Sequence, residues 1–443
     1  MAEPKKALSP EDRRMHLMLA LLALAVMINI LGFSVILPLI PDYVQSGMHL
    51  TNPQDPRIGE YGGWLGASYA LMQFLFAPFW GSLSDRIGRK PILIGSLVGD
   101  AVFYTLFGLS THNIYGQFAA RILAGIFSSA SLAVAQAYAA DITPPHLRAM
   151  GLGYIGAAFG FGFVIGPAVG GLIGQHHLAW PLYFSAGLAL ANLVYIARYL
   201  PEPSRVPQAA GSPSATLTSR LGLMTQAVRG PMGFLYLLTF AVTFAFANLE
   251  GTFTVYLKQH FHFANSIAVA GYVFAYIGIL IVIIQGFLIR RLVKRFGEPN
   301  LVVVGIGLMA LGFLAFPFAP ILTLLLVGPM LPIAVGSGLN GPSLRSLVSR
   351  KATAQGAALG LSASFDSLAR ATGPATAGYL YKHVGQTAPY WCAGLVMSLC
   401  FLFALTRRRE MAEGITPTPQ TGTEQTGTEQ TGAEQTGTER SVA

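Results

Sequence analysis

The chain has 443 residues, of which 53% are hydrophobic and only 11% are charged, and its mean hydropathy is +0.54. A soluble protein of ordinary composition carries about 25% charged residues, so this chain has too few to cover a water-facing surface. The composition excludes an ordinary soluble enzyme and indicates that lipid surrounds most of the chain.

Apolar stretches long enough to cross the core of a bilayer, roughly 17–25 residues each, occur twelve times. The predicted spans are 15–40, 60–81, 91–110, 115–140, 148–175, 180–200, 233–257, 264–289, 300–317, 319–341, 354–381 and 388–406. No small-residue cleavage site follows the first stretch, so we expect it to be retained as a span. Cys392 and Cys400 have a spacing that fits neither a metal site nor a disulfide framework, and we expect no metal and no cofactor.

Basic residues are distributed unevenly between the predicted loops. They cluster on one side of the spans, at 5–14, 86–90, 290–295, 345–351 and 407–409, whereas the opposite loops hold only Arg57, Lys258 and Lys382. Since cytoplasmic loops are rich in Lys and Arg, this pattern predicts a multi-pass protein of the inner (cytoplasmic) membrane with both termini cytoplasmic. The net charge of +9 then reflects cations that face anionic lipid headgroups, and we expect no nucleic acid partner.

The spans fall into two groups of six. We expect an N-terminal six-helix bundle at 1–200, a cytoplasmic linker at 201–232, a C-terminal six-helix bundle at 233–406 and a disordered cytoplasmic tail at 407–443. A glycine followed by a basic cluster joins the second and third spans of each half, at 81–90 and 286–297, as a weak internal repeat. The tail repeats TGTEQ without large apolar residues, so it cannot bury a core, and an inert tail is favoured over a tether. The sequence thus predicts an all-α integral membrane fold with twelve transmembrane helices in two pseudo-symmetric bundles, as in many secondary transporters.

The loop after the second span has the most specific pattern in the chain, with Gly81, Asp85, Arg86, Gly88 and Arg89 in one short run. We expect Gly81 to let a neighbouring helix approach closely and Gly88 to permit a tight turn. Asp85 is placed to lie near a helix N-terminus or to pair with an arginine across the interface between the halves. Either contact would favour one conformation of a rocking pair of bundles. The alternative is a basic loop that only sets the topology.

The fifth span carries a second pattern, with Gly162, Gly166 and Gly170 every four residues and with Pro167 and Gly171 among them. Glycines at this spacing form one smooth helix face for close contact with another helix. Pro167 removes a backbone hydrogen bond and is expected to bend the helix. Simple helix packing explains part of this pattern.

These two patterns resemble those of a known family. The run Asp85-Arg86-x-Gly88-Arg89-Lys90 is similar to the signature loop of the major facilitator superfamily. The run Gly162-x-x-x-Gly166-Pro167-x-x-Gly170-Gly171 resembles the motif of that superfamily's antiporters, which occurs mainly in exporters. Arg121, followed by Gly125, matches an arginine in the fourth span of this family, and the resemblance implies a role for it in proton transfer. Over residues 15–406 the chain therefore resembles the drug/proton antiporters, including tetracycline-type and multidrug efflux transporters.

The resemblance to tetracycline exporters of the Gram-negative type departs at three positions. Those exporters carry a first-span carboxylate, a third-span carboxylate and an eighth-span histidine, where this chain has Asn29, Phe103 and Ile281. Asp100 lies one helical turn from Phe103 and is a candidate to replace the third-span carboxylate. The resemblance therefore leaves the identity of the substrate open.

Ionisable residues within the predicted spans are few, and each is costly to bury unless it is paired or faces water. Glu250 has no cation within one turn of its own helix, so it is a candidate to load and release a proton. Asp366 and Arg370 are spaced for a mutual ion pair. The candidates for proton coupling are Glu250, Asp100, Arg121 and Asp366, and the candidates for the substrate cavity are Asn29, Gln73, Gln136 and Arg370.

We therefore expect a proton-coupled secondary antiporter that exports small organic molecules such as drugs by alternating access. A proton-coupled importer of a nutrient or metabolite has the same fold and is the alternative, although the fifth-span motif argues against it. An integral-membrane enzyme is a remote alternative, because no metal-ligand set, nucleophile elbow or phosphate loop lies within a span. The expected partners are a small-molecule substrate, protons and the lipid bilayer, and we expect a monomer.

Overall fold

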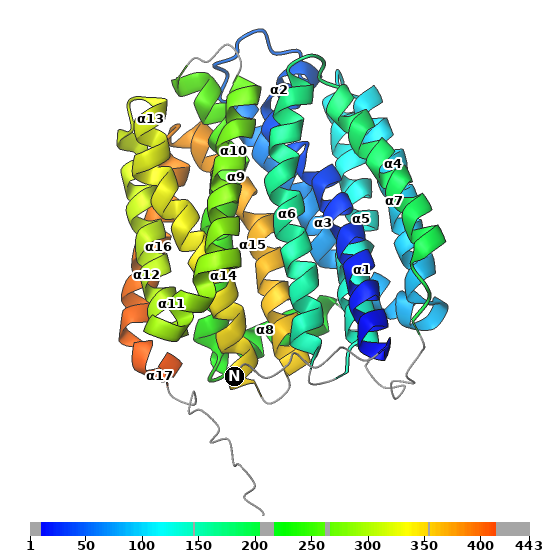
Figure 1. Cartoon of the computed structure of the whole chain (residues 1–443). Helices are drawn as coiled ribbons and strands as arrows, with labels where there is room; N and C mark the ends of the chain where they lie inside the picture. Colours follow the sequence, from blue (N-terminus) through cyan, green and yellow to red (C-terminus); the bar gives the residue numbers. More distant parts are fainter. Residues whose placement is uncertain (1–9, 145–146, 204–216, 262–265, 353–354, 413–443) are drawn as a thin grey trace, which may run out of the picture.

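The computed structural model describes residues 10–144, 147–203, 217–261, 266–352 and 355–412. In these ranges the chain is helical and contains no strand, and its long helices stand side by side (Figure 1). Hydrophobic stretches that are long enough to cross a bilayer satisfy every backbone polar group within the helix, which explains why these segments are helical.

The first half contains the first six predicted spans. Its first span is interrupted after Ser34, where a short 3-10 turn at Leu37–Leu39 leads into a second helix. Prolines at 38 and 41 fit this break because each stands in the first turn of a helix, where its missing N–H is not needed. The helices are α1 Pro10–Ser34, α2 Ile40–Gly47, α3 Arg57–Ile87, α4 Arg89–Leu109, α5 Ile114–Ile142, α6 Arg148–Gly174 and α7 Trp180–Tyr199.

The second half contains the last six predicted spans. π-helical turns at Ile284–Leu288 and Leu326–Met330 interrupt two of them. The predicted division near residues 317–320 is observed, because α12 ends in a 3-10 turn at Phe316–Phe318. The helices are α9 Gly233–His260, α10 Ser266–Ile283, α11 Ile289–Phe296, α12 Glu298–Ala315, α13 Leu322–Leu325, α14 Leu331–Lys351, α15 Gln355–His383 and α16 Ala388–Thr406.

Two shorter helices lie outside the spans. Helix α8, Leu217–Arg229, falls within the segment predicted to be a linker. Helix α17, Arg408–Ala412, falls within the segment predicted to be a disordered tail, so that prediction is wrong for these five residues. An arginine-rich end of a span continues here as one more helical turn. Residues 413–443 lie outside the described part of the chain.

Ten helices in the described ranges are long and apolar enough to cross a membrane. The two other predicted spans correspond to α3 and α15, which have 31 and 29 residues and are more polar. These helices pack against each other, since a Cβ at Gly63 of α3 would lie 3.0 Å from the Cα of Gly378 in α15. A helix that packs against other helices has less surface in contact with lipid, so its sequence can be less hydrophobic and still span the membrane. The predicted fold class, twelve transmembrane helices in two bundles, is confirmed.

The halves, α1–α7 and α9–α16, meet along α3 with α15 and along α6 with α10. At the second contact a Cβ at Gly171 would lie 3.2 Å from the Cα of Gly271. The start of α1 and helix α17 lie at the same end of the bundle, the lower end in Figure 1, which we call the terminal face. The opposite end, with the loops 48–56, 110–113, 175–179 and 384–387, is called the distal face.

Candidate functional site

The loop between α3 and α4 is organised around one arginine. Gly88 separates the two helices with a φ of 113°, a conformation that favours glycine. Directly after it, the backbone N–H of Arg89 donates to Glu202 Oε1 at 2.6 Å, so Glu202 caps the start of α4. The Arg89 side chain donates from Nε to Asp141 Oδ2 at 2.8 Å and pairs through an Nη atom with Asp85 Oδ1 at 2.6 Å. The loop therefore ties α3 and α4 to α5 and to the end of α7.

The structure decides between the two alternatives for Asp85 and contradicts the expectation for Gly81. Asp85 does not pair across the interface in the described part of the chain; it pairs with Arg89, the first residue of α4, so it lies at a helix N-terminus, and its side chain is 56% exposed. Gly81 does not meet a neighbouring helix, since a Cβ there would have no heavy atom within 4 Å. Arg86, at the same end of α3, is exposed.

The glycine face of α6 packs against α1. A Cβ at Gly162 would lie 2.6 Å from the Met27 carbonyl oxygen, and one at Gly166 or Gly170 would overlap Ser34 Oγ or the Val35 carbonyl oxygen. Ser34 Oγ also donates to the Gly162 carbonyl oxygen at 3.0 Å. Gly171 faces the other way, toward α10 of the second half, and Pro167 lies on that side as well. Helix α6 therefore packs closely against α1 of its own half on one face and against α10 of the other half on the opposite face.

A buried carboxylate lies inside the first half. Asp100 on α4 is fully buried, and the Asn29 amide on α1 donates to its Oδ2 at 2.9 Å. Its Oδ1 has no hydrogen-bond partner among the described residues. Asn29 and Asp100, which were predicted as site residues for separate reasons, are thus in direct contact. Phe103, one turn away, packs instead against the ring of Phe127.

Arg121 on α5 lies among aromatic rings rather than beside a carboxylate. It is 1% exposed, and its guanidinium carbon is 5.3 Å from the Tyr69 ring centroid and 5.4 Å from that of Phe107. None of its side-chain nitrogens has a hydrogen-bond partner among the described residues. Tyr69 donates to Ser128 Oγ at 2.6 Å and accepts from Gln73 at 3.2 Å. Tyr69 is therefore the residue that connects Arg121 to Gln73.

Of the candidates of the second half, Arg370 reaches the interface, whereas Asp366 is bonded within its own half. Asp366 and Arg370 do not form an ion pair in the described structure, and the spacing-based expectation of one is wrong. Asp366 instead accepts a hydrogen bond of 2.6 Å from Thr243 of α9. Arg370 extends to the first half, where its guanidinium carbon lies 5.3 Å from the Phe159 ring centroid and 6.0 Å from that of Phe163. Asp366 and Arg370 each contact residues of other helices and not each other.

Glu250 lies beside this group. Its Oε1 is buried without a hydrogen-bond partner among the described residues, and Arg370 is the cation that interacts with it electrostatically. Glu250, Arg370 and the α6 rings thus form a charged and aromatic group that spans both halves. Gln136 is not part of it; this residue is partly buried on α5 and makes no hydrogen bond that the described structure shows.

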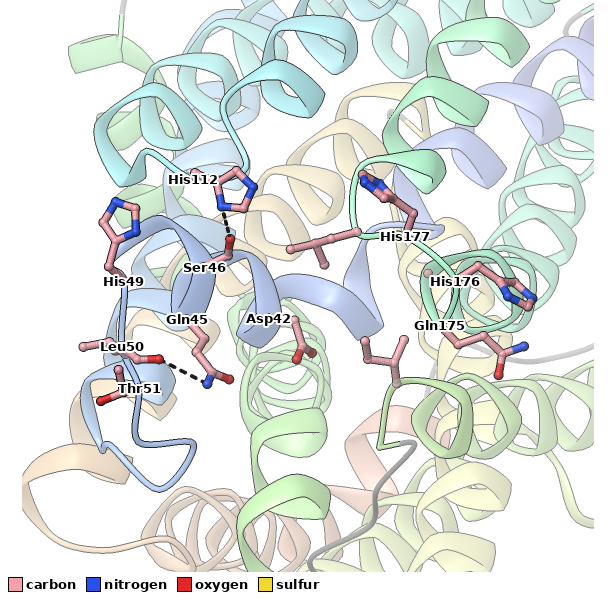
Figure 2. Close-up of a pocket in the computed structure, with 13 residues that line it drawn as sticks. Asp42, Gln45, Ser46, His49, Leu50, Thr51, His112, Gln175, His176 and His177 are labelled. Carbon is pink, nitrogen blue, oxygen red and sulfur yellow. Dashed lines mark hydrogen bonds between the residues drawn. The ribbon is translucent and has the colours of Figure 1, made fainter.

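A pocket of about 610 Å³ opens on the distal face. Figure 2 shows that the end of α2 forms one side and that His112, His176 and His177 come from the two neighbouring loops. His112 Nδ1 and Ser46 Oγ are 2.8 Å apart. Asp42 also lines the pocket and accepts a hydrogen bond of 2.5 Å from Lys258 of α9.

Ion pairs join the two halves at this distal face, and they were not predicted from the sequence. Lys258 Nζ contacts Asp42 Oδ1 at 2.5 Å and Gln45 Oε1 at 2.7 Å, and Lys382 Nζ contacts Glu60 Oε2 at 2.6 Å. We call the two ion pairs, Lys258–Asp42 and Lys382–Glu60, the distal latch. The sequence offered a sign of these ion pairs, because Lys258 and Lys382 are two of only three Lys or Arg residues on the distal side of the spans. The third, Arg57, pairs at 2.7 Å with Asp55 of its own half.

The terminal face is different. Every ion pair found there in the described residues lies within one half, as Arg89–Asp141 and Arg350–Glu298 do. The described hydrogen bonds between side chains of the two halves also lie at the distal end. The halves are therefore clasped at the distal face and not by ion pairs at the terminal face.

Comparison with known proteins places this arrangement in a family. The family model described as Major Facilitator Superfamily matches residues 22–374. The tetracycline resistance protein, class C, of Escherichia coli is 32% identical over 391 residues, which are 86% of this chain and 94% of that protein. Multidrug resistance protein 2 of Bacillus subtilis is 29% identical, over 84% of this chain and 90% of that protein. The crystal structure of the human organic anion transporter MFSD10 matches with a TM-score of 0.69 and 27% identity, over 90% of this chain and 100% of that chain.

Proposed function

The chain belongs to the Major Facilitator Superfamily, and we propose that it is a proton-coupled antiporter that exports small organic molecules by alternating access. As a member of this transporter family it is a multi-pass membrane protein with a small-molecule substrate. Drugs, with tetracycline-like compounds among them, are the proposed substrate class. The relatives named for tetracycline and multidrug resistance support export as the direction, and so does the α6 glycine face.

The observation that carries the proton coupling is the position of Glu250. A carboxylate within a membrane span is costly to ionise unless a partner compensates it. Glu250 has a buried oxygen that accepts no hydrogen bond from the described residues, and its electrostatic partner, Arg370, reaches across to rings of the other half. Movement of the halves changes the distance between these groups, so proton binding at Glu250 depends on the conformation. Asp100 is the second candidate, because Asn29 donates to one of its oxygens and no described residue donates to the other.

The proposed orientation follows the basic residues. The terminal face carries the arginine clusters of α11 and α17 and is assigned to the cytoplasm, with both chain ends on that side. The conformation with a closed distal latch then faces the cytoplasm and is the one that takes up substrate from the cell. We propose that one chain is sufficient for transport, because Glu250, Asp100 and the latch are all formed within it.

The direction of transport is tested in energised inverted vesicles that contain the protein. A panel of antibiotics and lipophilic dyes is added, and accumulation in the vesicles and release of protons from the lumen are measured together. We expect both to occur for some members of the panel. Uptake of a metabolite by whole cells, with no export of any panel member, would show that the protein is an importer.

The coupling residue is tested in proteoliposomes. Neutralising the essential carboxylate removes the proton but not the substrate site, so Glu250→Gln or Asp100→Asn is expected to abolish uphill export while keeping counterflow. Asp55→Asn is the matched control, because Asp55 pairs with Arg57 within one distal loop. If both single variants and the double variant still export uphill, the proton rides on another group, and Asp366 is the next to test.

A further inference from the structure

A second pocket opens on the terminal face, at the edge of the C-terminal half. It has a volume of about 850 Å³ and lies where the turn between α11 and α12 meets the junction of α16 and α17 (Figure 1). Phe296, Pro299 and Asn300 line one side of it, and Leu405, Arg408 and Arg409 line the other. This pocket is at the opposite end of the molecule from the distal latch.

Among the described residues, the charge of this pocket is positive and has no paired carboxylate. Glu298, at the start of α12, is held by Arg350 at 3.2 Å and by Ser346 at 2.6 Å. Glu410, in α17, pairs with Arg407 at 2.7 Å. In the described part of the chain, Arg408 and Arg409 have no ion-pair partner of their own. Two arginines with fixed positive charge therefore face a pocket whose neighbouring carboxylates are already paired.

The walls of the pocket are continuous with surface that faces lipid. Phe296 is 48% exposed and Leu405 is 47% exposed. Beyond them, α12 and α16 present further exposed apolar side chains, among them Val304 and Leu402. In a membrane protein such surface lies against acyl chains. A ligand that fits both features has an anionic head and an apolar body.

We propose that this pocket binds an anionic phospholipid, with its phosphate at Arg408 and Arg409 and an acyl chain along Phe296 and Leu405. The planar guanidinium group of arginine suits phosphate oxygens, which it can bind with two parallel hydrogen bonds. Basic pockets between transmembrane helices at the headgroup level are suited to such lipids.

The bound lipid would join the ends of two spans and the short helix α17. It would connect the start of α12 to the end of α16 and to α17. Helix α17 is in turn tied to α14, because Lys351 Nζ donates to the Glu410 carbonyl oxygen. Binding of the lipid would therefore hold the ends of α12, α14, α16 and α17 together at the terminal face.

Native mass spectrometry of the full-length protein in detergent tests this proposal. Phosphatidylglycerol or phosphatidylcholine is added, and the dissociation constant of the first lipid adduct is measured. One cation near a membrane surface contributes roughly fivefold in affinity, so Arg408→Gln/Arg409→Gln is expected to weaken phosphatidylglycerol binding roughly 30-fold. The matched control is Arg13→Gln/Arg14→Gln, which removes two exposed cations from the terminal end of α1 in the other half. This control is expected to keep the wild-type affinity.

Two further arms identify the source of the phosphate and guard against unfolding. Phe296→Ser keeps the charge but loses apolar wall, and it is expected to weaken lipid binding without creating a response to inorganic phosphate. Arg408→Lys/Arg409→Lys keeps the charge if the glutamine variant does not fold, and it is expected to bind more weakly than wild type. Equal binding of both lipids, displacement of phosphatidylglycerol by millimolar inorganic phosphate, or wild-type affinity in the folded arginine variants would overturn the proposal.

Discussion

Replacing Lys258 with glutamine removes the cation of one latch ion pair while keeping a polar side chain. The pair joins α9 of one half to α2 of the other, with 2.5 Å between Nζ and Asp42 Oδ1. Both side chains are 18% exposed, so the pair is intermediate between a surface and a buried one. Without Lys258, Asp42 is left largely buried with an uncompensated charge, which is why the variant is expected to weaken the closed distal face.

The size of the effect follows from that partial burial. Exposed ion pairs contribute about 0.2–1 kcal/mol, whereas removing one partner of a buried pair costs about 3–5 kcal/mol. An intermediate loss of about 1–3 kcal/mol changes a conformational equilibrium roughly 5–150-fold. If the distal-open state holds about 1% of the molecules, a twentyfold change raises it to about 17%. Lys382→Gln removes the other latch pair and is expected to add to this shift.

The assay is a distance measurement between spin labels on the distal rim. Tyr115→Cys on α5 and Val384→Cys after α15 place the labels, because these side chains are 84% and 70% exposed in opposite halves. Cys392 and Cys400 are first replaced by serine. Double electron–electron resonance in lipid should show a longer-distance population that grows in Lys258→Gln.

Arg57→Gln is the control for this measurement. It removes the third distal cation, but Arg57 pairs with Asp55 inside one half, so the distance distribution is expected to stay as in wild type. An unchanged distribution in Lys258→Gln, or an equal change in Arg57→Gln, would show that the interhalf ion pair does not hold the distal face closed. Restoration by the charge-exchanged variant Asp42→Lys/Lys258→Asp would support a direct pairing.

Two further predictions concern the motifs. Asp85→Asn removes a half-exposed contact worth less than about 1 kcal/mol, so thermal stability should hardly change. Because Asp85 helps to hold Arg89, which ties this loop to Asp141 of α5, we expect the looser loop to slow counterflow. Wild-type turnover in a correctly inserted variant would show that the loop only sets the topology. Gly166→Ala places a Cβ on Ser34 Oγ and should destabilise the protein by about 1–3 kcal/mol in thermal unfolding. Gly160→Ala is its control, because a Cβ at Gly160 meets no heavy atom within 4 Å, and equal melting temperatures would contradict the proposed α1–α6 packing.

Much of the fold was predictable because span length and hydropathy are set locally. Twelve apolar stretches were identified from the sequence, including α3 and α15, which are the most difficult to detect by hydropathy. The break near residues 317–320 was visible from its prolines. The interruption after Ser34 was not predicted, because the apolar pattern continues through it and only the backbone reveals the turn.

The site was less predictable, because its contacts join distant parts of the chain. The spacing of Asp366 and Arg370 permits an ion pair on one helix, but Thr243 and the rings of α6 supply other partners. The latch joins residues that are more than 200 positions apart, as Lys258 and Asp42 are. Asp100 was selected through its distance from Phe103, and the structure places it against Asn29, a contact that no local pattern contains.

The latch has a strength that suits a transport cycle. A contact that closes one face must be strong enough to prevent leakage but weak enough to break in every turnover. Two pairs of the strength expected above, about 1–3 kcal/mol each, would meet both conditions, whereas a fully apolar seal at this face would have to re-expose its whole buried area to open. Asp42 also lines the distal pocket (Figure 2), so in the export cycle proposed above a molecule that leaves at this face meets a residue that closes it. Opening the latch and releasing substrate would therefore involve the same carboxylate.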